Sequence, residues 1–344
     1  MLDLFAGPGG LDVAAHWVGV PVTGIEWDQN ACATRDKAGL DTEMGDVRSF
    51  GPSDFPDANV LAGGPPCQTF TMAGSGAGRR ALDEVLAFAK QMAAGVDVSA
   101  SLARLDDERT GLVLEPLRWA LEAHSGGNPY DTIVLEQVPS VLPVWKAMEG
   151  ALAEIGYQST SGILRAEQFG VPQSRRRAIL IASRHHAPEL PKPTHRKFRK
   201  GVPRLAGDEC LAPWLTMGEV LTRDRSFIVV SNYGSGGDPK ARGRRTSNEP
   251  AATVTGKVSR NRVLSSKGVE QKRFSHTEAG QLQTFPKNYP WRGNAIAQQI
   301  GNAIPPRLAA HVLAAALGMQ LSKDFFANDA TTSWRNTPVS ADDE

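Results

Sequence analysis

The 344-residue chain has few cysteines, few aromatic residues and almost no net charge. Its three cysteines, Cys32, Cys67 and Cys210, are too few and too scattered for a disulfide scaffold or for the paired cysteines of a zinc site. No apolar run approaches the ~18 residues that a membrane span requires, and the amino-terminal MLDLFAGPGG lacks the features of a signal peptide. The sequence therefore predicts a cytoplasmic globular protein with reduced thiols and no metal site.

The net charge of +1 conceals an uneven distribution of charge along the chain. Residues 184–275 carry 19 Lys and Arg against 8 Asp and Glu, whereas the remainder is acidic. A basic block within an acidic chain is typical of a surface that binds a polyanion, most often nucleic acid. A solvated loop region rich in Lys and Arg would explain the charge alone equally well.

Apolar runs of strand length alternate with helix-length segments in the first half of the chain. These runs lie at 1–5, 21–26, 59–62, 132–135 and 178–183. The alternation predicts an α/β fold with a mostly parallel, three-layer sheet. The segment 74–108 is too long for a simple connection, so we expect a mobile or functional loop there, although 81–94 has helical character.

From about residue 185 the chain becomes rich in Pro, Gly, Lys and Arg, with weak periodicity. We expect a small, loop-rich domain at 187–271, and a larger domain built from 1–186 and 272–344. An Ala-rich apolar helix at 306–319 returns to the larger domain. The polar residues 325–344 are expected to be disordered.

The segment DLFAGPGG (3–10) stands where a strand meets a helix. Its glycines allow a tight turn and the close approach of a ligand, at the place where α/β sheets bind nucleotides. Glu26 ends the second strand, where a carboxylate can bind two ribose hydroxyls. Trp27 could stack on adenine, and Asp46 could accept a hydrogen bond from its amino group. Taken separately, these three residues are also explained as surface charge and a half-buried aromatic.

The segment GGPPCQ (63–68) presents Cys67 after two prolines at the end of a strand. A preorganised, partly exposed thiol is what a nucleophile requires. Glu136 ends the next apolar strand, so its carboxyl group could lie near Cys67 and donate a proton to a ring nitrogen of a substrate. Taken alone, Glu136 is also explained as the cap of the following helix.

Polar side chains alternate in FGVPQSRRR (169–177), directly before a buried strand. In an extended chain Gln173, Arg175 and Arg177 share one face, which indicates a bound phosphate or base carbonyl. In QIGNAIPP (299–306), Asn302 is either the cap of the last helix or a contact to a cofactor.

Together these motifs closely resemble those of the DNA (cytosine-5)-methyltransferases. They occur in that family's order and at plausible spacings, and are DLFAGPGG, GIEWD, GDVR, GGPPCQ, LEQV, FGVPQSRRR and QQIGNAIPP. NEPAATVTG and HTEAGQLQTFP resemble further blocks of the family. The resemblance runs from the first residue to about 320 and leaves out the variable basic region.

The resemblance implies a Rossmann-like sheet that binds S-adenosyl-L-methionine, with a small target-recognition domain. It implies methyl transfer to carbon 5 of cytosine in a specific sequence of double-stranded DNA, through a covalent Cys67 adduct on a flipped-out base. Glu136 would bind the base at N3 and its exocyclic amine, and Arg177 would bind the base carbonyl. Arg175 and Gln173 would order the catalytic loop and a nearby phosphate.

Two sets of contacts follow from the resemblance and from the charge of the basic block. The implied contacts to the cofactor are Phe5, Ala6, Gly7, Gly9, Gly10, Glu26, Trp27, Asp46, Val47, Pro66, Leu112, Asn302 and Ile304. The candidate contacts to DNA are Arg199, Arg223, Arg242, Arg244 and Arg245.

The sequence departs from the family at two places near the predicted nucleophile. Gln137 stands where an Asn usually braces the cysteine loop, and we expect this to tune the loop rather than abolish activity. The segment after Gln68 is some twenty residues longer than the family's catalytic loop. We expect a stand-alone, monomeric bacterial or phage modification enzyme, with a cognate restriction endonuclease as a possible partner.

The sequence argues against three other functions. A catalytically inactive DNA-binding relative is disfavoured because Cys67 and Glu136 are both present. A tRNA cytosine-5 methyltransferase would carry a Cys-Phe-Thr motif, but Cys210 is followed by Leu-Ala. A dinucleotide-dependent oxidoreductase explains the glycine-rich turn and Glu26, but neither GGPPCQ nor the arginines before the last strand.

Overall fold

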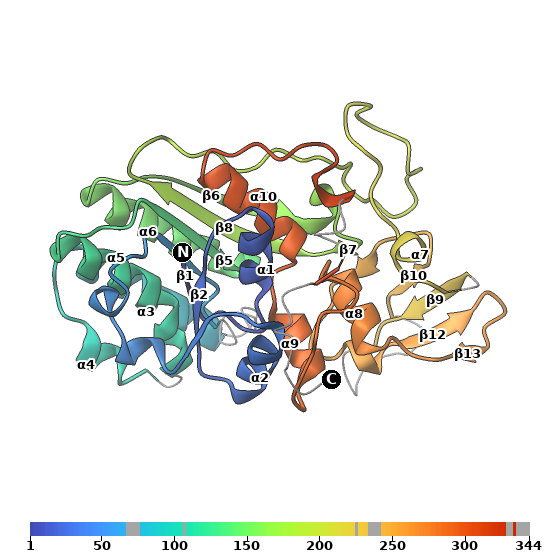
Figure 1. Ribbon diagram of the computed structural model, residues 1–344, viewed down its shortest axis with the longest axis horizontal. Coiled ribbons are helices and arrows are strands. Elements are labelled where there is room, and N and C mark those ends of the chain that lie inside the picture. Colours follow the sequence, from blue (N-terminus) through green and yellow to red (C-terminus); the bar gives the residue numbers. More distant parts are fainter. Residues whose placement is uncertain (67–75, 106–107, 224–225, 233–241, 328–332, 335–344) are drawn as a thin grey trace, which may run out of the picture.

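A seven-stranded sheet in the order β3-β2-β1-β4-β5-β8-β6 forms the larger part of the molecule (Figure 1). The computed structural model describes residues 1–66, 76–105, 108–223, 226–232, 242–327 and 333–334. Five strands run parallel: β3 (Thr42–Met44), β2 (Thr23–Glu26), β1 (Leu2–Leu4), β4 (Val60–Gly63) and β5 (Thr132–Gln137). Strand β8 (Arg176–Ser183) pairs antiparallel with both β5 and β6 (Gln158–Arg165), so it alone runs opposite to the other strands of this sheet. The prediction of a mostly parallel α/β sheet is confirmed.

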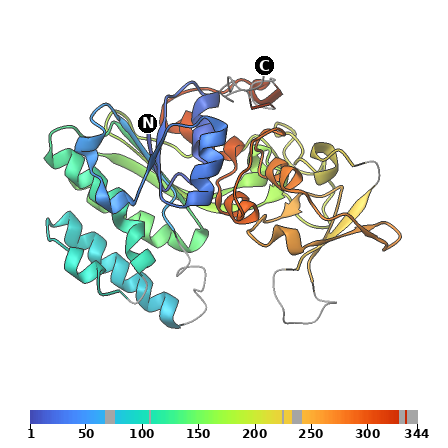
Figure 2. The same ribbon diagram turned by 60° about the horizontal axis from the view of Figure 1, so that its bottom comes forward.

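Helices cover both faces of this sheet, so the fold has three layers (Figures 1 and 2). One face is covered by α3 (Gly76–Ala93), α5 (Glu115–Ser125) and α6 (Leu142–Glu154), which bury Trp119 and Trp145 among the aliphatic side chains of the strands. On the other face α1 (Gly10–Trp17) packs along α10 (Pro306–Ala316), whose alanines permit a close approach. Strands β1, β4 and β5 are buried on both faces, as continuous apolar runs predict.

The helical character expected at 81–94 is confirmed, but the expectation of a mobile or functional loop is wrong for that described part of 74–108, which is a packed helix. Helix α3 spans 18 residues and packs on α6. Val85 and Ala89 lie one turn apart and are buried, and Leu82 and Leu86 flank them on the same side. The short α4 (Ser99–Leu102) and the 3₁₀ helix η4 (Glu108–Leu114) then lead into α5.

A second, antiparallel sheet lies beside the first and belongs to the basic part of the chain. Its strands are β10 (Arg244–Thr246), β9 (Phe227–Val230), β12 (Arg262–Ser265) and β13 (Glu270–Gln271). Val229 and Val263 of this sheet share a core with Leu282 of α8 (His276–Leu282) and Ile300 of α9 (Ile296–Asn302). The short α7 (Met217–Val220) adds Met217 to this core. This core extends past residue 271, the expected end of the small domain, so the division into domains stays a prediction.

Two short elements connect the parts of the molecule. Strand β7 (Gln173–Ser174) pairs in parallel with β11 (Ala251–Ala252), and α2 (Gln29–Ala38) packs against both β3 and α9.

The expected disorder of 325–344 is wrong where the structure describes that stretch: Phe325–Ala327 forms a 3₁₀ helix and Trp334 is only 2% exposed. Among the described residues, no helix is long and apolar enough to span a membrane.

Candidate active site

The carboxyl ends of four parallel strands bring the predicted motifs together. In the sheet, Leu4 of β1 is in register with Ile25 of β2 and Gly63 of β4, and Gly63 is in register with Leu135 of β5. The residues that follow each strand therefore meet at one edge of the sheet. A Cβ atom added at Gly64 would lie 3.5 Å from a carboxylate oxygen of Glu136. Cys67 itself lies outside the described residues.

The glycine-rich turn after β1 has a backbone that most residues avoid. Phe5, Gly7 and Gly9 all have positive φ, at 61°, 56° and 98°. At Gly10, an added Cβ would lie 2.5 Å from the carbonyl oxygen of Ile304, so only glycine permits this contact. The sequence predicted the tight turn, and the structure adds that Ile304 packs directly behind it.

Glu26 is anchored beside this turn by backbone N–H groups. Its carboxylate accepts hydrogen bonds from Gly7 (2.7 Å), Trp27 (2.9 Å) and Asp28 (2.7 Å). Burial raises the pKa of Glu26, while these N–H groups oppose that shift. The indole of Trp27 is 60% exposed, which leaves its ring free to stack on a ligand.

The other predicted cofactor residues occupy different environments. Asp46 caps the 3₁₀ helix η1 (Val47–Ser49) and pairs with Arg48 at 2.6 Å; the hydrogen bond from the Arg48 side chain lowers the pKa of Asp46. Asn302 is the last residue of α9 and accepts a hydrogen bond from Gln298 at 2.8 Å. The alternative that Asn302 caps the last helix is wrong, because α10 begins at Pro306 with Pro305 in the cap position. The remaining side chains are buried or partly buried, and are Ala6, Val47, Pro66 and Leu112.

Glu136 and Arg177 form an ion pair at the end of β5. Nε of Arg177 lies 2.5 Å from Oε1 of Glu136, and the two side chains are only 12% and 8% exposed. The pairing of β5 with β8 produces this contact, since Gln137 is opposite Ala178 and Arg177 lies one residue further along. The two residues that the sequence assigned to the base are therefore in contact.

Gln137 braces the segment that leads to Cys67. Its side-chain amide donates a hydrogen bond to the carbonyl oxygen of Pro65, and its side-chain oxygen accepts one from the N–H of Val138. Gln137 is 7% exposed, so both bonds are shielded from water. The glutamine makes a bracing contact to the backbone of Pro65 despite its additional methylene group.

Gln173 and Arg175 do not share the surroundings of Arg177. Gln173 is fully buried and binds Leu282, Gln283 and the N–H of Val254. The guanidinium of Arg175 donates hydrogen bonds of 3.0 Å to three carbonyl oxygens, those of Val254, Gly301 and Ala303. Gln173 and Arg175 share a partner in Val254, whereas Arg177 pairs with Glu136, so the expectation of one face shared by all three residues is wrong. The buried contacts of Gln173 and Arg175 are made to the protein's own backbone and side chains.

The five candidate arginines for DNA differ in exposure. Arg223 pairs with Glu278 at 2.5 Å and lies over the rings of Phe227 and Phe274, so it stabilises the small sheet rather than facing solvent. Arg245 lies 3.6 Å from Glu249 and stacks on Phe198 at 4.5 Å. The others are more accessible: Arg199 and Arg244 are exposed and Arg242 is half-buried.

Sequence reasoning missed the polar residues that support the site from beneath. Asp12 and Arg35 form a fully buried bidentate pair under the glycine-rich turn. Burial and the nearby Asp12 raise the pKa of Asp3 well above its usual value. Tyr289 donates a hydrogen bond to the carbonyl oxygen of Pro8. The motif HTEAGQLQTFP ends three residues before Tyr289, and it is the one feature of the sequence that could have pointed to this residue.

A model of the C-5 cytosine-specific DNA methylase family matches residues 1–89 and 131–317. The chain belongs to this family. The methylase is therefore a DNA (cytosine-5)-methyltransferase, and the resemblance noted in its motifs is confirmed. The unmatched residues 90–130 include α4, η4 and α5.

Curated relatives of the methylase include bacterial type II methyltransferases. It is 24% identical to the type II methyltransferase M.NgoFVII of Neisseria gonorrhoeae over 89% of this chain and 83% of that protein. It is 26% identical to M1.HphI of Haemophilus parahaemolyticus over 94% and 87% of the two chains.

Solved structures support the same fold. The Dnmt2 methyltransferase of S. pombe has a TM-score of 0.59 at 16% identity, covering 92% of this chain and 97% of its own. A putative DNA modification methyltransferase encoded within an E. coli prophage has a TM-score of 0.56 at 19% identity, covering 92% and 98%. At these identities the likeness concerns the fold alone.

No group of three or more His, Cys, Asp or Glu suited to a metal ion occurs among the described residues.

Proposed function

We propose that the methylase uses S-adenosyl-L-methionine to methylate cytosine within a short sequence of double-stranded DNA, as the modification enzyme of a type II system. The observation that carries this proposal is the Glu136–Arg177 pair next to the Gly64–Pro66 segment, which leads to Cys67. A base carbonyl and a ring nitrogen could be bound there together. We further propose that it acts as a monomer, and that a restriction endonuclease with the same target is its partner.

The turn after β1 suits the cofactor. Gly7 has an open side, since a Cβ added there would meet nothing closer than 4.0 Å. Glu26 keeps acceptor capacity on Oε2, which takes only one backbone hydrogen bond, and can bind a ribose hydroxyl. Trp27 offers an exposed ring to adenine, and Asp46 would have to turn from its half-exposed partner Arg48 to accept from the adenine amine.

The residues of the chain then divide the chemistry between them. The thiolate of Cys67 adds to carbon 6 of cytosine, forming a carbon–sulfur bond, while Glu136 hydrogen-bonds N3 and the exocyclic amine. Arg177 binds the base carbonyl and offsets the negative charge that develops on the ring. S-adenosylmethionine supplies the methyl group as a sulfonium electrophile. A base removes the proton from carbon 5, and the carbon–sulfur bond breaks to return the thiolate of Cys67.

DNA is bound by the exposed part of the basic block. Arg199, Arg242 and Arg244 are accessible on or beside the small sheet, and Arg244 belongs to its edge strand β10. Arginine serves both phosphate binding and guanine recognition, so these residues are candidates for either contact. Carbon 6 is inaccessible within a duplex, and the target cytosine must be flipped out.

The test uses purified methylase, S-adenosylmethionine and unmethylated genomic DNA. Mass spectrometry of the digested nucleosides should detect 5-methylcytosine, and bisulfite sequencing of the same DNA should find it in one short context. Cys67→Ala should retain DNA and cofactor binding without turnover, whereas Cys210→Ser, at an exposed cysteine, should remain active. Methylation by Cys67→Ala would overturn the proposed nucleophile, and methylation without sequence context would overturn the proposed specificity.

A further inference from the structure

Trp334, far along the chain from the glycine-rich turn, is held in place against α1 and α2. Its indole Nε1 donates a hydrogen bond of 3.0 Å to the carbonyl oxygen of Ala38, at the end of α2. The backbone N–H of Trp334 donates a hydrogen bond to Oδ1 of Asn288 (2.7 Å), and Nδ2 of Asn288 donates one to the carbonyl oxygen of Trp334 (2.8 Å). The ring is 2% exposed and lies edge-on to His16 of α1 at 5.2 Å. Trp334 thus contacts α1 and α2 through its indole and Asn288 through its backbone.

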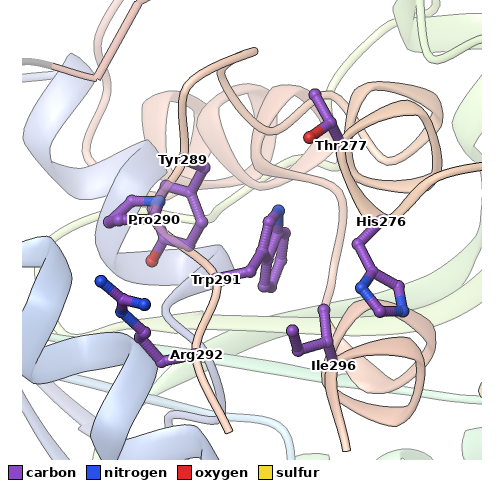
Figure 3. Close-up of a pocket in the computed structure, with 7 residues that line it drawn as sticks. All are labelled: His276, Thr277, Tyr289, Pro290, Trp291, Arg292 and Ile296. Carbon is purple, nitrogen blue, oxygen red and sulfur yellow. The ribbon is translucent and has the colours of Figure 1, made fainter. Parts of the chain in front are cut away.

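The indole of Trp334 forms one wall around Tyr289. The two rings lie 5.5 Å apart, and Tyr289 is only 4% exposed. On its other side Tyr289 packs against Phe285 (4.8 Å) and Trp291 (4.9 Å). Figure 3 shows Tyr289 beside Trp291, whose ring stands between Tyr289 and His276 at a cavity of about 360 Å³. The aromatic rings therefore fix the direction of the phenol.

That direction leads to the cofactor turn. The hydroxyl of Tyr289 donates a hydrogen bond to the carbonyl oxygen of Pro8, and a Cβ atom added at Gly9 would lie 2.9 Å from this hydroxyl. Burial, and next the carboxylate of Asp12, raise the pKa of Tyr289, so the phenol keeps its proton and remains a donor. Trp334, Tyr289 and Pro8 form a continuous series of contacts.

We infer that Trp334 is a positioning residue for the turn that binds the cofactor, acting through Tyr289. Without the indole, Tyr289 loses a wall and gains freedom to move. The Pro8–Gly9 backbone, which is in the left-handed region at Gly9, would then lose part of its support. A binding site whose backbone must first be ordered binds its ligand more weakly, because ordering costs free energy. This inference rests on the proposal that the turn binds S-adenosylmethionine.

The experiment measures binding of S-adenosylhomocysteine by titration calorimetry, which requires no turnover. We expect Trp334→Ala to weaken binding about tenfold, and Trp334→Phe to restore most of the loss, since a phenyl ring can still contact Tyr289. The matched control is Phe326→Ala, which removes a ring that packs on His311, Arg307 and Trp17 and that, among the described residues, makes no ring contact with Tyr289 or Trp334. It should lower the Tm and leave the Kd within about twofold of the wild-type value.

Two further variants keep the inference testable if Trp334→Ala does not fold. Tyr289→Phe removes only the hydroxyl and should weaken binding in the same direction, with faster amide hydrogen exchange at Gly9 and Gly10. Asn288→Ala frees the backbone of Trp334 and should do the same. Unchanged Kd values in folded Trp334→Ala or Tyr289→Phe would overturn the inference. So would a loss of affinity in Phe326→Ala equal to that in Trp334→Ala. A wild-type protein that does not bind S-adenosylhomocysteine would instead overturn the proposed function.

Discussion

Gln137 donates a hydrogen bond from its side chain to the carbonyl oxygen of Pro65, two residues before Cys67. The same side chain accepts from the N–H of Val138, so the two contacts tie the end of β5 to the end of β4. An amide at this position can therefore support the predicted nucleophile even with one methylene group more than the family's usual asparagine.

Removing this amide should slow the chemical step. In Gln137→Ala the carbonyl of Pro65 loses its partner and the preceding segment gains freedom, so we expect single-turnover methylation to fall about 10- to 100-fold. The KM for DNA should stay nearly unchanged, because the residue is 7% exposed. Gln137→Asn, which keeps the amide, should lie between wild type and Gln137→Ala. Equal rates in all three proteins would contradict this role.

The Glu136–Arg177 pair should be essential for turnover. Glu136→Gln keeps the shape but cannot donate a proton as a carboxylic acid does, and we expect a loss of kcat of at least about 100-fold. Arg177→Ala should cause a loss of similar direction. It also leaves the Glu136 carboxylate without its cation, so we expect a loss in the free energy of unfolding, smaller than that of Arg175→Ala because Arg177 is the more exposed of the two arginines. Retained turnover in either variant would mean that another group binds the base.

Arg175 should contribute to the stability of the fold rather than to turnover. Its substitution by alanine leaves buried carbonyls of Val254, Gly301 and Ala303 without their donor, and we expect a loss of about 3 kcal/mol in the free energy of unfolding. Urea denaturation of Arg175→Ala and Arg177→Ala side by side provides the comparison. If Arg177→Ala is destabilised by the same amount, the division into one structural and one catalytic arginine is wrong.

Two histidines, the buried His195 and the partly buried His311, should make the protein sensitive to acid. Burial lowers the pKa of His195 and of His311 to about 4. Between about pH 6.5 and 4 the unfolded chain binds protons that the native state excludes, so the free energy of unfolding falls as the pH falls through this window. The limiting slope is about 1.4 kcal/mol per pH unit for each proton. Chemical denaturation at a series of pH values measures this slope. His311→Gln should reduce it, and an unchanged slope would exclude His311 as a contributor.

DNA affinity should depend on Arg244 and not directly on Arg223. Arg244→Ala removes an exposed charge from strand β10 and should weaken DNA binding. The slope of the logarithm of the binding constant against the logarithm of the salt concentration should fall in magnitude by about one. Arg223→Ala breaks the pair with Glu278 and should lower the Tm first. Fluorescence anisotropy with a labelled duplex at several salt concentrations separates these effects. An unchanged salt slope in Arg244→Ala would remove it from the interface.

The sequence alone determined the parallel sheet, the turn after β1 and the family. These features depend on local patterns: apolar runs of strand length, glycines at positions with positive φ, and short motifs in fixed order. The residues expected at strand ends also come together, because parallel strands end at one edge of a sheet whatever else the chain does.

Only the tertiary structure decided what each polar side chain contacts. The pattern QSRRR could not show that Arg177 pairs with Glu136 while Arg175 is buried against carbonyls from residues 254, 301 and 303. The three carbonyl partners of Arg175 lie 79 or more residues away from it along the chain. Likewise, the polar composition of 325–344 predicts disorder, yet Trp334 has its place because α1, α2 and Tyr289 together form a site for an indole. Long-range packing creates such sites, whereas periodicity in the sequence reports only local structure.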